Sequence, residues 1–266
     1  MTAGTLSAAG RDRSGHGPVI TVALLAVAAT GWWWSARMAD DMAPAGEMPS
    51  SGMGGMGGME MGSSLSLGAF VVAWVAMMAA MMLPAVLPVV RLYARAAERG
   101  RAAPVLFFVA GYLGVWSAAG LPAYLAWRAL DEPLAAGEAW TGRVAAAALA
   151  AAAVWQLTPV KHACLRHCRS PLGFFLRARW ALRGRLGALR AGATHGLLCM
   201  GCCWALFAVL VALGTMNLAW MAVVTVFVVL EKHAPGGRRI ATAGGVACAG
   251  LAAVLLADPS TIAHIT

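Results

Sequence analysis

Apolar residues gather in blocks that are long enough to cross a bilayer as helices. They lie at residues 18–36, 65–90, 104–130, 140–160, 193–213, 216–230 and 240–257. A membrane-spanning helix needs about 20 such residues, and most of the blocks approach or exceed that length. They lack the alternation of apolar and polar residues that a transmembrane β-barrel requires. Charged residues make up only 12% of the chain, against about 25% in soluble domains. We therefore predict an all-α, polytopic membrane bundle of about seven transmembrane helices.

The positive charges predict how this bundle is oriented. With the N-terminus inside, all of the 20 Lys and Arg residues except Arg37, Arg128 and Arg143 fall on the inner side. The positive-inside rule favours this orientation over the reverse one. We expect a multi-pass protein of a bacterial inner membrane with a cytoplasmic N-terminus. The net charge of +9 then indicates contact with a lipid bilayer rather than with nucleic acid, because no soluble basic surface is present.

This orientation divides the chain into a leader, a loop, a membrane domain and a tail. These are the cytoplasmic N-terminus with the first transmembrane helix (1–37), an extracytoplasmic Met/Gly-rich loop (38–64), a six-helix membrane domain (65–257) and a short tail (258–266). We interpret the first helix as a retained anchor, with a signal peptide as the alternative. The basic segment at 161–190, in which Phe174 and Phe175 are interleaved with arginines, is expected along the inner membrane surface.

The extracytoplasmic loop carries closely spaced methionines. Met53, Met56, Met59 and Met61 are separated mostly by glycine, which lets a loop wrap an ion without steric cost. Thioether sulfur is a soft, uncharged ligand that suits Cu(I) and does little for Zn²⁺ or Ca²⁺. A flexible linker that happens to be Met-rich is the alternative. Because methionine is apolar and easily oxidised outside the cell, we favour metal capture.

Two methionine pairs lie within the second apolar block. Met77 and Met81, like Met78 and Met82, are four residues apart, so each pair shares a helical face. The alanines between them allow another helix to approach closely. Ordinary core packing is the alternative, since methionine fills gaps well. We treat all four thioethers as candidate metal ligands.

The fifth block carries a histidine and three cysteines. His195, Cys199 and either Cys202 or Cys203 follow at spacings of three and four, which places them on one helical face. A row of thiolate and imidazole groups suits copper or zinc. A single cysteine here would indicate nothing, because free cysteine is a common buried residue. Three of them within five residues indicate a candidate metal site.

Two further thiols follow the fourth block. Cys164 and Cys168 lie one turn apart in a segment expected to face the reducing cytosol, where a structural disulfide is disfavoured. They are candidate metal ligands, and incidental cysteines in a basic loop are an equal alternative. The sixth block ends at Glu231 and Lys232, where we expect Glu231 to snorkel or to pair with Lys232.

Depth in the membrane relates the methionines of the second block to the thiols of the fifth. A helix rises about 1.5 Å per residue. Counted from the block ends, both sets fall in overlapping slabs of a hydrocarbon core of about 30 Å. Contact between them is therefore possible, although depth alone does not show that they face each other.

Four stretches of the chain match a known pattern. They are Ala73–Pro84, Gln156–Gly173, Gly201–Leu206, and Met216–Met221 followed by Glu231 and Lys232. On these motifs the chain resembles a bacterial family of predicted metal-binding integral membrane proteins, a domain of unknown function (number 2182). The resemblance covers residues 65–257. It implies metal binding without naming a substrate or an activity.

The sulfur-rich and carboxylate-poor ligand set makes Cu(I) the expected metal and zinc the runner-up. We expect a copper carrier or a chaperone-like donor that serves copper homeostasis or cuproenzyme assembly and is not an enzyme. Its partner would be a copper-requiring membrane or periplasmic protein. Two alternatives stay open: a membrane thiol–disulfide oxidoreductase that uses Cys199 and Cys202 with Cys164 and Cys168, and a structural or assembly subunit without metal.

Overall fold

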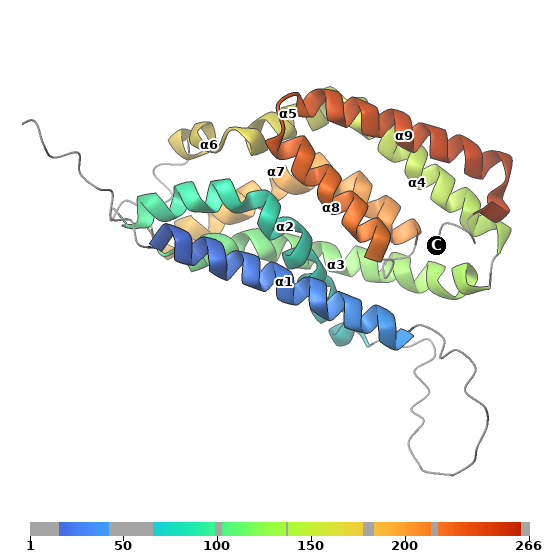
Figure 1. Cartoon of the computed structure of the whole chain (residues 1–266), viewed down its shortest axis with the longest axis horizontal. Helices are drawn as coiled ribbons and strands as arrows, with labels where there is room; N and C mark the ends of the chain where they lie inside the picture. Colours follow the sequence, from blue (N-terminus) through green and yellow to red (C-terminus); the bar gives the residue numbers. More distant parts are fainter. Residues whose placement is uncertain are drawn as a thin grey trace, which may run out of the picture.

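The computed structural model describes residues 16–42, 66–98, 103–136, 138–177, 184–213 and 218–261, and over these residues all regular secondary structure is helical. The longer helices lie side by side, most of them along the long axis of the molecule (Figure 1). Their bounds are His16–Met42 (α1), Leu67–Glu98 (α2), Val105–Ala135 (α3), Ala139–Leu157 (α4), Pro159–Arg169 (α5), Pro171–Arg177 (α6), Arg185–Ala212 (α7), Leu218–His233 (α8) and Gly237–Ala257 (α9), with a 3₁₀ turn at Pro259–Thr261 (η1). The predicted all-α class is confirmed for these residues.

Five of the described helices are long and apolar enough to cross a membrane: α1, α2, α3, α7 and α9. The pair α4 and α5 would add a sixth span if it counts as one, although its two parts meet at 67°. Helix α8 matches the sixth apolar block but has only 16 residues. We expected about seven spans, and length and composition support five or six.

Glycines bring α3 and α7 into close contact. A Cβ atom on Gly192 would lie 1.9 Å from the carbonyl oxygen of Phe108, and one on Gly111 would lie 2.0 Å from that of Leu189. Any side chain at these positions would clash with backbone, so the helices approach as small residues allow in membrane bundles. The crossing places Tyr112 of α3 against the middle of α7.

Helix α7 is shared by two hydrophobic cores. On one side it packs with α2, α3 and α8, and on the other with α4 and α9. Phe174 and Phe175 of α6 belong to the first core, where Phe175 meets the rings of Tyr93 and Phe108. Both phenylalanines are therefore buried against the bundle, and the expectation that the basic segment at 161–190 lies along the membrane surface stays a prediction.

The break between α4 and α5 has a local cause. Proline disfavours helical geometry at the preceding residue, and Thr158, which precedes Pro159, is extended with ψ 146°. Thr158 then caps the next helix, because its hydroxyl accepts a hydrogen bond from the backbone N–H of Lys161 at 3.2 Å. Pro159 occupies the first helical position, where its missing N–H costs nothing. The chain turns here, and α5 packs back against α7 and α8.

Prolines also shape α2, which continues through Pro84 and Pro88. A proline inside a helix removes a backbone donor and displaces the carbonyls one turn earlier. The carbonyl oxygen of Ala85, between the two prolines, lies 3.1 Å from Nε2 of His233 at the end of α8. A side chain from another helix thus contacts the α2 backbone beside the prolines.

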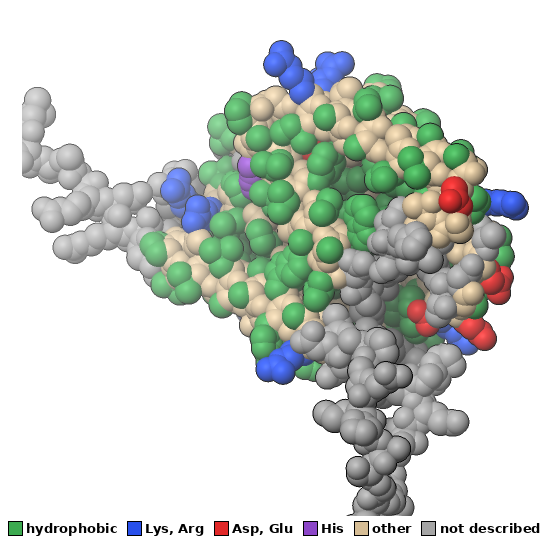
Figure 2. Space-filling model, turned by 45° about the vertical axis from the view of Figure 1, so that its right-hand side comes forward, with side chains coloured by type: hydrophobic (Ala, Val, Ile, Leu, Met, Phe, Trp, Pro, Cys, Tyr) green, Lys and Arg blue, Asp and Glu red, His purple; other side chains and the backbone are tan. Residues whose placement is uncertain are grey.

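The surface of the molecule is apolar along the helices and charged at their ends. Figure 2 shows one face covered largely by hydrophobic side chains, with the acidic groups on one side. Asp131 and Glu132 are exposed at the C-terminal end of α3, whereas Arg185 and Arg190 are exposed at the start of α7. Leu189, between those arginines, packs at the start of α3, so the acidic and basic groups lie at opposite ends. Soluble monomers rarely expose so much contiguous apolar surface.

Candidate sulfur-ligand site

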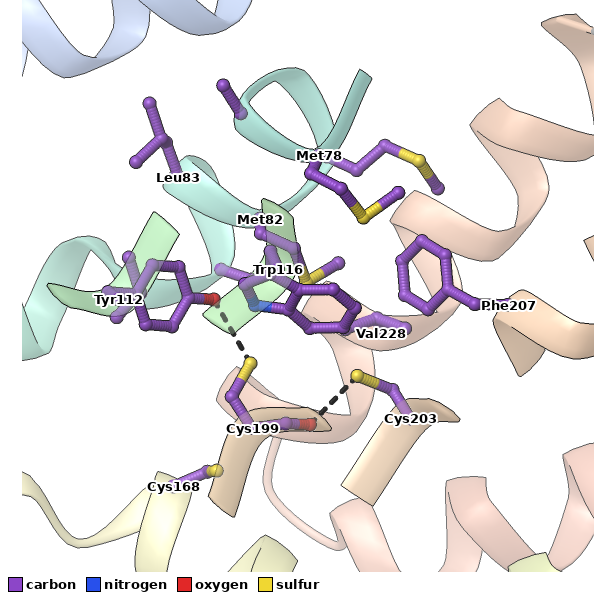
Figure 3. Packing of buried hydrophobic residues seen from close by; sticks show 14 of the residues in the cluster. Met78, Met82, Leu83, Tyr112, Trp116, Cys168, Cys199, Cys203, Phe207 and Val228 are labelled. Atoms are coloured by element: carbon purple, nitrogen blue, oxygen red, sulfur yellow. Dashed lines mark hydrogen bonds between the residues drawn. The ribbon is translucent and has the colours of Figure 1, made fainter. Parts of the chain in front are cut away.

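Four of the chain's six cysteines meet where α5 packs on α7. The thiol of Cys168 lies close to those of Cys199 and Cys202, and these two lie close to the thiol of Cys203. The three thiols of α7 are at most 1% exposed, and Cys168 is 8% exposed. Figure 3 shows Cys168 on α5 beside the turn of α7 that carries Cys199. We call these four residues the thiol cluster.

Hydrogen bonds to the helix hold part of the thiol cluster. The thiols of Cys202 and Cys203 donate to the carbonyl oxygen of Cys199 at 3.1 and 2.9 Å. All six cysteines are free of disulfides. Across the described ranges, no group of three or more His, Cys, Asp or Glu side chains forms a ready metal site. Two of the thiols would therefore have to rotate away from the helix backbone to bind an ion.

Cys199 has two partners that the sequence did not indicate. The hydroxyl of Tyr112 lies 3.0 Å from its Sγ, and the Nζ of Lys232 donates to the same sulfur at 3.0 Å. Tyr112 is 1% exposed and Lys232 is 8% exposed. A buried ammonium needs an anionic partner, and a thiolate at Cys199 provides one. The sequence feature that could have indicated this contact is Lys232, a charged residue at the end of an apolar block.

The methionines of α2 lie in the same hydrophobic core as the thiol cluster. Met77 is nearly buried, and Met78, Met81 and Met82 are fully buried. In Figure 3 the indole of Trp116 lies between the side chain of Met82 and the thiols of α7. Trp74 of α2 holds this segment of α3 by donating to the Trp116 carbonyl at 2.9 Å. Thioethers and thiols thus share one core, with Trp116 between them.

A buried ion pair joins α5 to α8. The Nζ of Lys161 on α5 contacts both carboxylate oxygens of Glu231 on α8, at 2.8 and 2.9 Å, and also donates to the side-chain oxygen of Gln156. Lys161 and Glu231 are fully buried. The expectation that Glu231 snorkels or pairs with Lys232 was wrong, because neighbours on a helix point in different directions. Glu231 faces α5, and Lys232 faces Cys199.

The remaining predicted ligands are placed less centrally. Cys164 is half-buried, and its sulfur would lie 3.0 Å from a Cβ added to Gly201. His195 is buried among the rings of Phe108, Tyr112 and Phe174. Its Nδ1 has no hydrogen-bond partner in the part of the chain that the structure covers. The loop methionines Met53, Met56, Met59 and Met61 lie outside the described residues.

Comparison with known proteins gives a match to a family model. No curated protein and no solved structure matches the chain. The model of the PpoB2 family, described as copper chaperone, matches residues 71–255. This range lies within the residues over which the motifs resemble a metal-binding family, and the match supports a copper-related family without supporting the name expected from those motifs. Because the match spans well over half of the sequence, this chain belongs to the PpoB2 copper chaperone family.

Proposed function

We propose that the chain is an integral membrane copper chaperone that holds Cu(I) as its cargo and catalyses no reaction. The observation that carries the proposal is that Cys168 on α5 lies close to Cys199 and Cys202 on α7, with all three buried inside the bundle. Thiolate sulfur is a ligand that selects Cu(I). Because the break at Pro159 separates α5 from α4, a hinge movement there would alter the thiol–thiol distances and release the ion.

Charge balance supports Cu(I) over zinc as the cargo. A complex of Cu(I) with two thiolates has a net charge of −1, which the ammonium of Lys232 beside Cys199 would neutralise. A complex of Zn²⁺ with four thiolates has a net charge of −2, and one lysine would leave half of that charge uncompensated. Net charge is costly inside a membrane bundle. The same arrangement would accept Ag(I), which has the charge and softness of Cu(I).

The proposed route of the ion follows the sulfur ligands across the membrane. The Met-rich loop would exchange Cu(I) outside the cell membrane, the thioethers of α2 would lie next along the route, and the thiol cluster would follow. Cys164, the half-buried thiol of α5, would be the cytoplasmic end of this route, and the Met-rich loop would be the end from which a periplasmic partner takes the ion. This route assumes a cytoplasmic N-terminus in a bacterial inner membrane, which the positive-inside rule favours. The partner would be a copper-requiring membrane or periplasmic protein.

Competition for Cu(I) tests the proposal. The detergent-purified chain should take Cu(I) from a chromogenic chelator under reducing conditions. Combined Cys199→Ser and Cys202→Ser should abolish this uptake, because no pair of adjacent thiols is left at the contact with Cys168. The matched control is Cys248→Ser, since Cys248 is a half-buried cysteine of α9 outside the thiol cluster. Equal uptake by both variants would refute the assigned site.

A further inference from the structure

A cavity of about 420 Å³ opens between α5 and the turn that joins α8 to α9. Its lining includes His162, Arg166 and Arg169 from α5, and Gly237 and Arg238 from the start of α9. The cavity is distinct from the thiol cluster, because no cysteine lines it. No acidic residue lines the cavity, so its charge is entirely basic.

The arginines of this cavity differ in whether they have a partner within the protein. Arg169 is engaged, since its Nη1 donates to the backbone carbonyl of Glu231 at 2.6 Å. Arg166 and Arg238 are exposed, and neither has an acidic partner among the residues that the structure covers. Both lie close enough to His162 to interact with it electrostatically. Like charges gathered without a counter-charge favour the binding of an anion.

The backbone at the cavity adds to this preference. Helix α9 follows Gly236, which adopts a left-handed conformation with φ 81°, and no side chain caps its first turn. The N-terminal end of a helix carries a partial positive charge and unpaired N–H groups, which bind phosphate well. Here the helix end supplements a cavity that its arginines already make basic.

We propose that this cavity binds the phosphate group of an anionic phospholipid. Arginine matches phosphate oxygens in a bidentate fashion, and basic pockets between membrane helices bind anionic headgroups. Leu157 and Val160 do not line the cavity but lie within two residues of Pro159, which does; they are 54% and 55% exposed and would contact the acyl chains. A free phosphate ion shares the headgroup chemistry but not these apolar contacts. The lipid source depends on the membrane embedding proposed above.

A bound headgroup would connect α5 to the turn that follows α8. Helix α5 carries Cys168, and α8 carries Lys232 immediately before the turn that forms the cavity. A phosphate held by Arg166 and Arg238 would bridge α5 to the start of α9. We therefore expect the lipid to stabilise the position of α5 without contacting any thiol.

The test compares three added compounds on the detergent-purified chain: phosphatidylglycerol, a diacylglycerol with the same tails, and inorganic phosphate. Retained lipid is counted by native mass spectrometry, and stabilisation is measured by thermal unfolding. Arg166→Gln combined with Arg238→Gln should weaken phosphatidylglycerol binding roughly ten-fold. The control combines Arg190→Gln with Arg239→Gln, two exposed arginines that do not line the cavity, and should bind as the unmodified chain does.

Each outcome decides the proposal. Phosphatidylglycerol binding that needs Arg166 and Arg238 and that inorganic phosphate does not displace identifies the lipid headgroup as the ligand. If inorganic phosphate binds in the same arginine-dependent way, the phosphate site stands and its source is the free ion. Equal binding of diacylglycerol, or equal loss in both double variants, overturns the site. The thermal unfolding transition shows whether each variant is folded, and Cu(I) uptake by the same preparations tests the proposed function separately.

Discussion

The ammonium of Lys232 donates a hydrogen bond to the sulfur of Cys199 at 3.0 Å, although 33 positions separate the two residues. The hydroxyl of Tyr112 approaches the same sulfur at 3.0 Å. A charged side chain inside a membrane bundle is costly and marks a functional position by default. Three helices, α3, α7 and α8, therefore converge on one thiol, which makes Cys199 the centre of the candidate site.

Removing the charge of Lys232 should weaken copper binding. Lys232→Met keeps an unbranched apolar chain of similar length but leaves the Cu(I)–thiolate charge uncompensated. A hydrogen bond to a charged group contributes about 1.5–3 kcal/mol, so we expect Cu(I) affinity to fall by about ten-fold or more. Chelator competition measures this, and Lys232→Arg should retain more affinity because it keeps the charge. Unchanged affinity in Lys232→Met would leave the lysine with a structural role only.

The thioethers of α2 should contribute to copper handling and little to stability. Met78→Leu with Met82→Leu conserves volume, so each change should cost less than about 1.5 kcal/mol of unfolding free energy. Loss of the soft ligands should slow transfer of Cu(I) from the thiol cluster to an external chelator, measured by stopped flow. Met221→Leu, at a methionine of α8 that is 2% exposed, is the matched control. Identical transfer rates in both variants would assign Met78 and Met82 to packing.

Much of the architecture followed from the sequence, because apolar blocks and helical spacing are local properties. The block lengths predicted most of the long helices, and spacings of three and four predicted the shared face of Cys199 and Cys203. Overlapping depths made a common core for the α2 methionines and the α7 thiols possible, and the structure shows that core. Whether this core binds metal stays a prediction.

Partners from distant helices were not predictable in the same way. Tyr112 reaches Cys199 only because Gly111 and Gly192 let α3 and α7 cross closely. Cys168 turns inward only because the chain breaks at Pro159 and α5 packs back on α7. Both contacts depend on how the helices cross, and the spacing of residues along a single helix gives no information about crossing.

The close crossing of α3 and α7 gives a test of the fold. Gly192→Ala places a methyl group against the Phe108 carbonyl, and overpacking of this kind costs about 1–3 kcal/mol. Thermal unfolding in detergent should show the loss, and Cu(I) uptake should fall because Tyr112 moves away from Cys199. Gly250→Ala is the control, since nothing lies within 4 Å of its added Cβ. Its higher helix propensity should leave stability equal or raised by up to about 1 kcal/mol. Equal effects at both glycines would contradict this account of the crossing.

The buried pair of Lys161 and Glu231 should behave as a unit. Removing one partner, as in Glu231→Leu, leaves a buried ammonium without its counter-charge and should cost about 3–5 kcal/mol of unfolding free energy. Removing both charges, by Lys161→Met with Glu231→Leu, takes away the uncompensated charge and should restore a large part of that loss. Thermal unfolding of the two single variants and the double variant closes the cycle. Cu(I) uptake should recover in the double variant, because the pair positions α5 without contacting the thiols. If the double variant is as unstable as the sum of the two single variants, Lys161 and Glu231 act independently, and α5 is held in place by its apolar contacts.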